Sequence, residues 1–254
     1  MRFSAGFHII QRMPETRPKT RLVLFDLDET LFDHSHASRC GLKTLQDEYD
    51  GFGAPSLDEL ESTAFEILNR THRKILSGVL TQEEGCIERF RLLAEWCGSS
   101  LGEDEIQAAS RRYRQVYRSS RRAMSGAIEL LKCLRERVTV GIVTNNFVRE
   151  QKSKLADCEL DPWIDFMVTS EETGQAKPAA EIFHKALETT GASPDEAVMI
   201  GDSWEVDIIG AKAVGIRPVW YNPAATEPPA GEAVSELRSF LPTSEALEIV
   251  LPTA

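Results

Sequence analysis

The feature that most constrains the fold is a set of short apolar runs that alternate with amphipathic helical segments. The runs lie at residues 21–28, 138–145, 165–170, 197–202 and 217–222. Nearly unbroken apolar runs of this length are typical of strands that are buried on both faces of a parallel sheet. Because helical patterns separate the last four runs, we expect right-handed βαβ units and a doubly wound parallel α/β sheet.

The stretch between the first two runs has a helical pattern and no clear strand. Apolar residues recur there at helical spacing, first around residues 57–68 and again around 87–94. A Pro-rich loop at 222–232 precedes a tail with no defined pattern. We therefore expect a polar lead-in at residues 1–20, an α/β core from residues 21–36 and 124–254, and an all-helical cap at residues 37–123.

Composition and charge exclude several classes of function. The formal net charge is −11 and the pI is near 5.1, and an acidic protein is repelled by nucleic acid. No apolar run approaches the ~20 residues that are needed to cross a membrane. The 5 cysteines are widely spaced without a zinc-binding pattern, so we expect reduced thiols and a cytoplasmic location.

Two pairs of aspartates follow predicted strands. Asp26 and Asp28 end the first strand, and Asp202 and Asp207 follow the strand at 197–202. Taken alone, such an aspartate more often caps a turn or complements a helix dipole. Ligands bind beyond the carboxyl ends of parallel strands, and both pairs are expected at that edge. Together they predict an oxygen-rich site that suits Mg²⁺.

Polar residues of another kind follow the remaining strands. Thr144 and Asn145 end the strand at 138–145, where hydroxyl and amide donors can hold phosphate oxygens. Lys177 precedes Pro178 at the start of a predicted helix. Each of these residues alone fits an ordinary turn or a solvated loop. Beside the carboxylates, however, a lysine would help to neutralise a bound phosphate.

Together these segments resemble the four motifs of the haloacid dehalogenase (HAD) superfamily, in the family's order. The first to fourth motifs are Asp26-Leu27-Asp28-Glu29-Thr30, Thr144-Asn145, Lys177-Pro178 and the segment from Gly201 to Asp207. Each lies at a predicted strand end or helix start. The resemblance covers residues 21–222 and implies a Rossmann-like core, and the helical insert resembles the family's first type of cap.

The resemblance implies catalytic and phosphate-binding roles. Asp26 would attack phosphorus and form an aspartyl-phosphate, while Asp28 would protonate the leaving oxygen and then activate water. The phosphoryl group would be held by Thr144, Asn145 and Lys177.

The resemblance also implies a metal site. Mg²⁺ would bind the side chains of Asp26 and Asp202 and the backbone carbonyl of Asp28, with Asp207 supporting it. The expected function is magnesium-dependent hydrolysis of a small-molecule phosphomonoester. The protein is therefore expected to be a hydrolase of the phosphatase class.

Other activities on the same fold are weighed against this one. The alternatives are a sugar-phosphate mutase, which usually has Gly where this chain has Glu29, and a module that binds a phosphorylated ligand without turnover. Dehalogenases lack the second aspartate of the first motif, so Asp28 favours phosphate chemistry. Receiver domains also carry Asp, Thr and Lys at strand ends, but they are much shorter and have no helical insert.

The cap is expected to select the substrate. Its last predicted helix contains six arginines within residues 111–122, a pattern that usually marks a solvated helix face. The alternative is that Arg111, Arg114 or Arg118 faces an anionic substrate. His34 and His36 are expected to be exposed linker residues. Among HAD relatives, the resemblance is nearest to nucleotidases and sugar-phosphate phosphatases.

Overall fold

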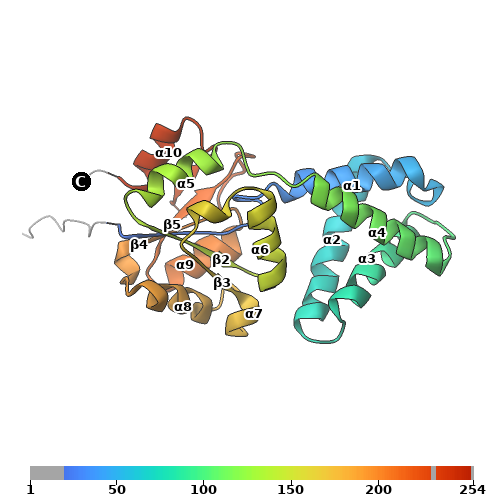
Figure 1. Cartoon of the computed structure of the whole chain (residues 1–254), viewed down its shortest axis with the longest axis horizontal. Coiled ribbons are helices and arrows are strands. Elements are labelled where there is room, and N and C mark those ends of the chain that lie inside the picture. The colour runs from blue at the N-terminus through green and yellow to red at the C-terminus, as the bar shows by residue number, and fades with distance from the viewer. Residues whose placement is uncertain (1–19, 230–232, 253–254) are drawn as a thin grey trace, which may run out of the picture.

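The chain folds around one parallel sheet (Figure 1). The computed structural model describes residues 20–229 and 233–252. Within them six strands pair in parallel in the order β3-β2-β1-β4-β5-β6. The strands are β1 (Leu22–Phe25), β2 (Thr139–Thr144), β3 (Phe166–Thr169), β4 (Ala197–Gly201), β5 (Arg217–Tyr221) and β6 (Ser235–Leu237). Since β1 to β5 lie in the five apolar runs, the predicted parallel α/β sheet is confirmed.

Alternate residues of the central strand face opposite layers of helices. Val23 and Phe25 pack in one core cluster with residues of α5 (Ala127–Arg135) and α10 (Thr243–Val250). Leu22 and Leu24 pack in a second cluster with residues of α8 (Ala180–Thr190) and α9 (Ile209–Ala213). Burial on both faces explains why the sequence of this strand is an unbroken apolar run.

Shorter elements complete the core. They are α6 (Val148–Asp157), α7 (Ser170–Thr173), the 3₁₀ turns Asp161–Trp163 and Pro194–Glu196, and a π turn at Trp204–Ile208. The π turn and α9 occupy the place of the single helix that the sequence indicated after β4. Gly191 ends α8 with a positive φ of 65°, as its place after the last apolar residue predicted.

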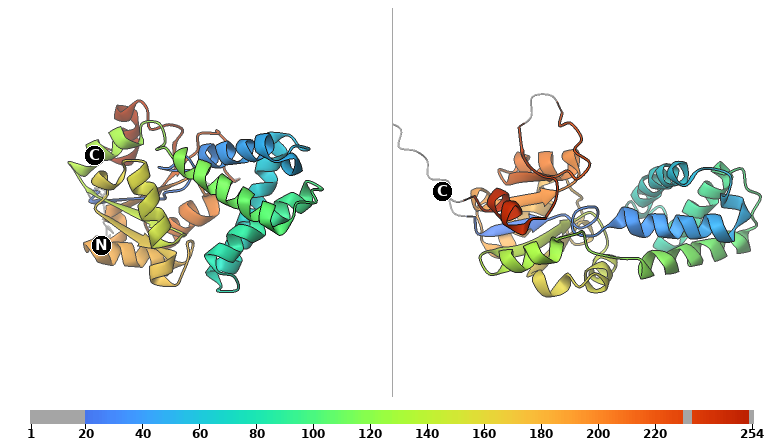
Figure 2. Two further views of the ribbon diagram at one scale, coloured as in Figure 1. Left: turned by 45° about the vertical axis from the view of Figure 1, so that its right-hand side comes forward. Right: turned by 90° about the horizontal axis from the view of Figure 1, so that it is seen from above.

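Four long helices form a separate unit beside the sheet (Figure 2). They are α1 (His34–Glu48), α2 (Leu57–Leu76), α3 (Gln82–Trp96) and α4 (Glu103–Ser119), with a 3₁₀ turn at Asp50–Phe52. Ser56 with Glu59 and Thr81 with Glu84 form the capping boxes that begin α2 and α3. The helices share their own apolar cluster.

Two chain segments connect the helical unit with the core and run side by side. Phe32 and Ala123 form an antiparallel bridge, and the N–H of Met124 donates to the carbonyl of Leu31 at 2.8 Å. Arg122 reaches back to the carboxylate of Asp33, at 2.7 Å. The two connections are therefore bonded to each other.

The end of the chain is more ordered than its sequence pattern indicated. After the Pro-rich loop the tail forms β6 at the sheet edge and α10, which packs on α5. The predicted lead-in at residues 1–20 lies, except for Thr20, outside the described residues. None of the described helices has the length and apolar character of a membrane span.

Candidate active site

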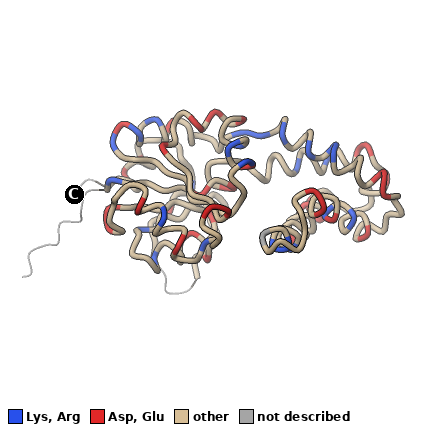
Figure 3. Tube along the Cα trace, turned by 60° about the horizontal axis from the view of Figure 1, so that its bottom comes forward, with Lys and Arg blue, Asp and Glu red and all other residues tan. Residues whose placement is uncertain are grey.

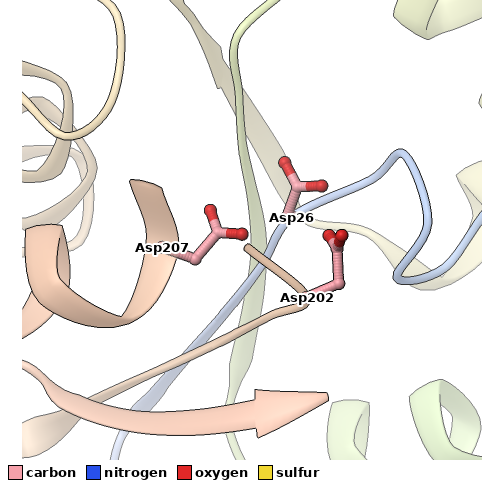
Figure 4. Close-up of side chains that lie close together, drawn as sticks. All are labelled: Asp26, Asp202 and Asp207. Atoms are coloured by element: carbon pink, nitrogen blue, oxygen red, sulfur yellow. The ribbon is translucent and has the colours of Figure 1, made fainter. Parts of the chain in front are cut away.

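Three carboxylates converge beyond the carboxyl ends of β1 and β4 (Figure 4). Asp26 follows β1, while Asp202 and Asp207 follow β4. One oxygen atom from each lies within 4.8 Å of the others, an arrangement that can hold a metal ion. The backbone N–H of Asp26 donates to the carbonyl of Ile200 at 2.9 Å. This bond aligns the ends of β1 and β4. The fourth predicted carboxylate, that of Asp28, lies outside this cluster.

A buried lysine lies against the carboxylates. Lys177 Nζ donates to Asp26 Oδ1 and to Asp207 Oδ1, in both cases at 2.6 Å. Burial alone would lower the pKa of Lys177, but the two neighbouring carboxylates, Asp207 and Asp26, outweigh it and raise the pKa above its ordinary value. The lysine is therefore charged, and the structure brings it to the same edge as the aspartates.

The negative charges of the carboxylates are only partly balanced by Lys177. Burial raises the pKa of Asp26 well above its ordinary value, and repulsion from Asp207 and Asp202 opposes the attraction of Lys177. Burial likewise raises the pKa of Asp202 to about 6, with repulsion from Asp207 second. One lysine thus leaves the cluster short of positive charge, which a divalent cation with oxygen ligands would supply.

Gly201 makes room for Asp207. A Cβ atom on Gly201 would lie 2.4 Å from Asp207 Cγ, far inside van der Waals contact. The N–H of Ser203 donates to Asp207 Oδ2 at 3.1 Å, and the N–H of Asp207 donates to the carbonyl of Ser203 at 2.9 Å. The turn after β4 therefore folds tightly around this one carboxylate.

Asp28 is held by a different element, helix α6. Its carboxylate accepts a hydrogen bond from Gln151 Nε2 at 3.0 Å and forms an ion pair with Lys154. Gln151 Nε2 also donates to Thr144 Oγ1 at 2.6 Å. Burial would raise the pKa of Asp28, but Lys154, followed by His34, outweighs it and lowers the pKa. Asp26 and Asp28 thus belong to separate networks.

Asn145 joins the end of β2 to the lysine loop. Its side-chain amide donates to the backbone carbonyl of Lys177 at 2.9 Å and accepts from the backbone N–H of Lys177 at 2.6 Å. Both polar atoms of the Asn145 side chain are therefore engaged with the main chain. The side chain is placed to hold Lys177 in position rather than to reach a substrate.

Sequence reasoning missed the partners of Asp28. Gln151 and Lys154 are fully or almost fully buried although both are polar. Their spacing of three residues puts them on one face of α6. That face could have been inferred from the position of the helix directly after Thr144. His34 and His36 were also misjudged as exposed linker residues, because both lie in α1 and are half-buried. His34 Nδ1 lies 2.9 Å from the hydroxyl of Tyr117.

A cleft of about 600 Å³ opens between the helical unit and this edge of the sheet. Its wall includes Asp202 and Trp220 from the core and Phe65 and Leu68 from α2. Phe65 is 57% exposed, unusual for an aromatic side chain. The cleft is the space next to the carboxylates in which a ligand can lie.

The arginine-rich segment divides into two groups, and α4 ends at Ser119, before Arg121 and Arg122. Arg112, Arg121 and Arg122 pair with carboxylates, and Arg121 is buried between Glu150 and Asp157 of α6. No ion pair is found for Arg111, Arg114 or Arg118 within residues 20–229 and 233–252, and these three are exposed. Since Arg121 alone of the six is buried, the solvated surface that such a run usually indicates describes the other five.

Gly201→Ala tests the tight turn around Asp207. The added methyl group must displace the carboxylate or the turn, so we expect a loss of about 1–3 kcal/mol in the free energy of unfolding. Urea titration followed by circular dichroism measures it. Gly53→Ala is the control, since its Cβ would meet only the Asp50 carbonyl at 3.6 Å. Equal stability of the two variants would contradict the steric role of Gly201.

Asp202→Asn tests the charge shortage of the cluster. The folded pKa of about 6 lies above the ordinary 3.8, so ionisation of Asp202 costs stability as pH rises between these values. In EDTA, the variant should unfold at a higher temperature than the wild type at neutral pH. The difference should vanish below about pH 4. Asp47→Asn, at an exposed position on α1, should show no such pH dependence; a less stable Asp202→Asn at neutral pH would contradict the interpretation.

Comparison with known proteins agrees with these geometric findings. The family model of haloacid dehalogenase-like hydrolases matches residues 20–215, most of the chain. The ribulose-1,5-bisphosphate 5-phosphatase of Halopiger xanaduensis is 32% identical over 203 residues, which cover 80% of this chain and 84% of that protein. The human N-acylneuraminate-9-phosphatase is 29% identical over 217 residues, which cover 80% and 83%.

The fold has a solved counterpart as well. The magnesium-bound crystal structure of the HAD-hydrolase YfnB from Bacillus subtilis superposes with a TM-score of 0.71 at 26% identity, covering 92% of this chain and 100% of that one. The prediction that the chain is an enzyme, a hydrolase of the phosphatase class, is confirmed. On the family match, the relatives and the architecture together, the chain belongs to the haloacid dehalogenase-like hydrolases.

Proposed function

We propose that the chain hydrolyses a small phosphorylated metabolite, a phosphomonoester, by transferring the phosphoryl group to Asp26 and then to water. The observation that carries the proposal is the pairing of Asp26 with Lys177 inside a cluster of carboxylates, with Asp28 on a separate network nearby. A carboxylate nucleophile divides hydrolysis into two easier steps. Phosphoryl transfer otherwise needs positioning and neutralisation of charge.

In the first step an Asp26 carboxylate oxygen bonds to phosphorus while the bond from phosphorus to the alcohol oxygen breaks. Lys177, which contacts Asp26, balances the charge of the phosphoryl oxygens. The departing oxygen takes a proton from Asp28. Arrival of a phosphate dianion raises the pKa of a neighbouring carboxyl and so favours the protonated form that this step needs.

In the second step Asp28 accepts a proton from water, whose oxygen attacks the phosphorus of the aspartyl-phosphate and releases Asp26. The ion pair with Lys154 and the hydrogen bond from Gln151 favour the ionised form of Asp28, which is the proton acceptor. The same two residues fix the direction of its carboxylate. We assign them as positioning residues for this step.

The cluster of Asp26, Asp202 and Asp207 fits Mg²⁺ by the chemistry of its donors, which are all carboxylate oxygens. The Asp28 side chain is bound elsewhere, so Asp28 would contribute only its backbone carbonyl. When bound, the ion supplies positive charge at the phosphoryl oxygens.

We propose different roles for Thr144 and Asn145, the two other predicted phosphate-binding residues. Thr144 Oγ1 accepts from Gln151 and has its own proton available for a phosphoryl oxygen. The Asn145 side chain instead holds the backbone of Lys177. We propose phosphate binding for Thr144 and a positioning role for Asn145.

The unit of α1 to α4 is proposed to be the cap expected at residues 37–123, although α1 already begins at His34, with the core on either side. Closure of such a cap over the cleft excludes water and selects the leaving group. All five cysteines are free, as expected of a cytoplasmic protein. We propose that location, and a small molecule as the substrate.

Asp26→Asn tests the nucleophile. An amide cannot form the acyl phosphate, so we expect phosphate release from p-nitrophenyl phosphate to fall by at least about 10³-fold. Asp47→Asn, at an exposed position on α1, is the matched control and should keep wild-type activity. Turnover by a correctly folded Asp26→Asn protein at the wild-type rate would exclude Asp26 as the nucleophile.

Removal of metal tests the ion. With EDTA in excess, phosphate release should stop, and Mg²⁺ should restore it, because Lys177 alone does not balance the carboxylates and the phosphate. Added Mg²⁺ should also raise the unfolding temperature of the wild type by mass action, and raise that of Asp202→Asn less. Full activity in EDTA would show that the site works without a metal.

A further inference from the structure

Arg89 of α3 is a fixed cation for which no ion pair is found within residues 20–229 and 233–252. Its Nε donates to Thr71 Oγ1 at 2.8 Å, and Thr71 in turn donates to the carbonyls of Ile67 and Leu68 at 2.8 and 3.0 Å. In the part of the chain that the structure describes, its terminal guanidinium nitrogens make no hydrogen bond. Arg91, two residues further on, pairs with Glu88 and Glu103 instead. The half-buried Arg89 thus presents an unused donor fork.

The surroundings of Arg89 place it on the side of the cap that faces the catalytic edge. Thr71 is followed by His72, whose Nε2 lies 3.2 Å from the carbonyl of Asn145 at the end of β2. The ring of His72 also packs edge-on against Phe147. The residue that anchors Arg89 is therefore the neighbour of a direct contact between the cap and the second motif.

Arg89 and Asp28 shift the pKa values of the same two histidines in opposite directions. Burial lowers the pKa of both His34 and His72, and the charge of Arg89 lowers each further. The charge of Asp28 raises both. Both imidazoles therefore lie within electrostatic reach of the cap cation and of the carboxylate that serves the leaving oxygen.

The neighbours of Arg89 do not balance its charge. The strongest influences on it are burial, the thiol of Cys86, and the hydroxyls of Tyr113 and Tyr117. The next is a like charge, that of Arg114, which lowers the pKa of Arg89 as burial does. Acidic and basic residues are interspersed over both parts of the molecule (Figure 3), and the chain as a whole is acidic.

We propose that Arg89 binds a second anionic group, a carboxylate or a second phosphate, on the alcohol part of the substrate; this rests on the proposed phosphatase function. The alcohol part leaves at Asp28 and must extend toward the cap. A guanidinium fork suits a carboxylate or phosphate because two parallel N–H···O bonds form. The charge of Arg114 also reaches Arg89.

The wall of the cleft repels such a group. Its wall carries the carboxylates of Glu29, Asp58 and Glu61 together with the apolar Phe65. An anionic end of the substrate is therefore disfavoured along that wall. The acidic and apolar wall is left for the uncharged part of the molecule.

Matched pairs of esters test the proposal, with Mg²⁺ present. Glycerol 3-phosphate is compared with 3-phosphoglycerate, and fructose 6-phosphate with fructose 1,6-bisphosphate, so the two pairs distinguish a carboxylate from a second phosphate. For at least one pair the wild type should prefer the anionic ester in kcat/KM. Arg89→Met should reduce that preference by about 10-fold or more, or about 1.4 kcal/mol, chiefly through KM. Arg89→Lys should retain part of it.

Arg91→Met is the matched control, since Arg91 lies on the same helix but is paired, and it should keep the wild-type preference. Thermal unfolding establishes that each variant is folded. A wild type that hydrolyses these esters without preferring an anionic one, or an Arg89→Met protein that keeps the preference, overturns the role of Arg89 while the phosphatase function stands. Absence of hydrolysis of every ester and of p-nitrophenyl phosphate overturns the function itself.

Discussion

The ion pairs that Lys177 makes with Asp26 and Asp207 are the interaction on which the rest of the site depends. Three carboxylates that are brought together out of water repel one another and lose their hydration. The lysine offsets part of this cost at distances of 2.6 Å. Its own position depends on Asn145, which clamps the backbone of Lys177 to the end of β2. Three strand ends are thereby tied together by a single cation and one amide.

The two aspartates of the first motif are separated chemically by the elements that surround them. Asp26 lies among carboxylates, and burial raises its pKa. Asp28, two residues later, lies against Lys154, which lowers its pKa. One carboxylate therefore depends on Lys177, from the segment between α7 and α8, and the other on helix α6. Their separation lets neighbouring residues serve as nucleophile and as proton carrier in the proposed reaction.

The helical unit is joined to the core through two connections that are bonded to each other. The bridge between Phe32 and Ala123 links the two segments where they enter the helical unit. Arg121 adds a buried contact from the end of α4 to α6, the helix that holds Asp28. Helix α6 therefore contacts both Asp28 and the segment that follows α4.

The sequence by itself determined the sheet and the edge at which the site forms. Strands that are buried on both faces must be apolar throughout, so the five runs were visible without a structure, and the polar residues that end them mark one edge. The tertiary structure decided what those residues touch. β6 and α10 were not visible because short edge elements carry little periodicity.

Three features of the site depend on contacts between residues far apart in the chain. They are the partners of Asp28, the engagement of the Asn145 side chain and, within the described residues, the unpaired state of Arg89. Gln151 and Lys154 look like ordinary surface positions until α6 packs against Asp28. Likewise, Arg89 and Arg91 are both arginines of one helix, and only packing gives Arg91 two carboxylates and leaves Arg89 none among the residues that the structure describes. Sequence patterns record which residues are buried or polar, whereas pairing of charges is fixed by geometry that only the folded chain supplies.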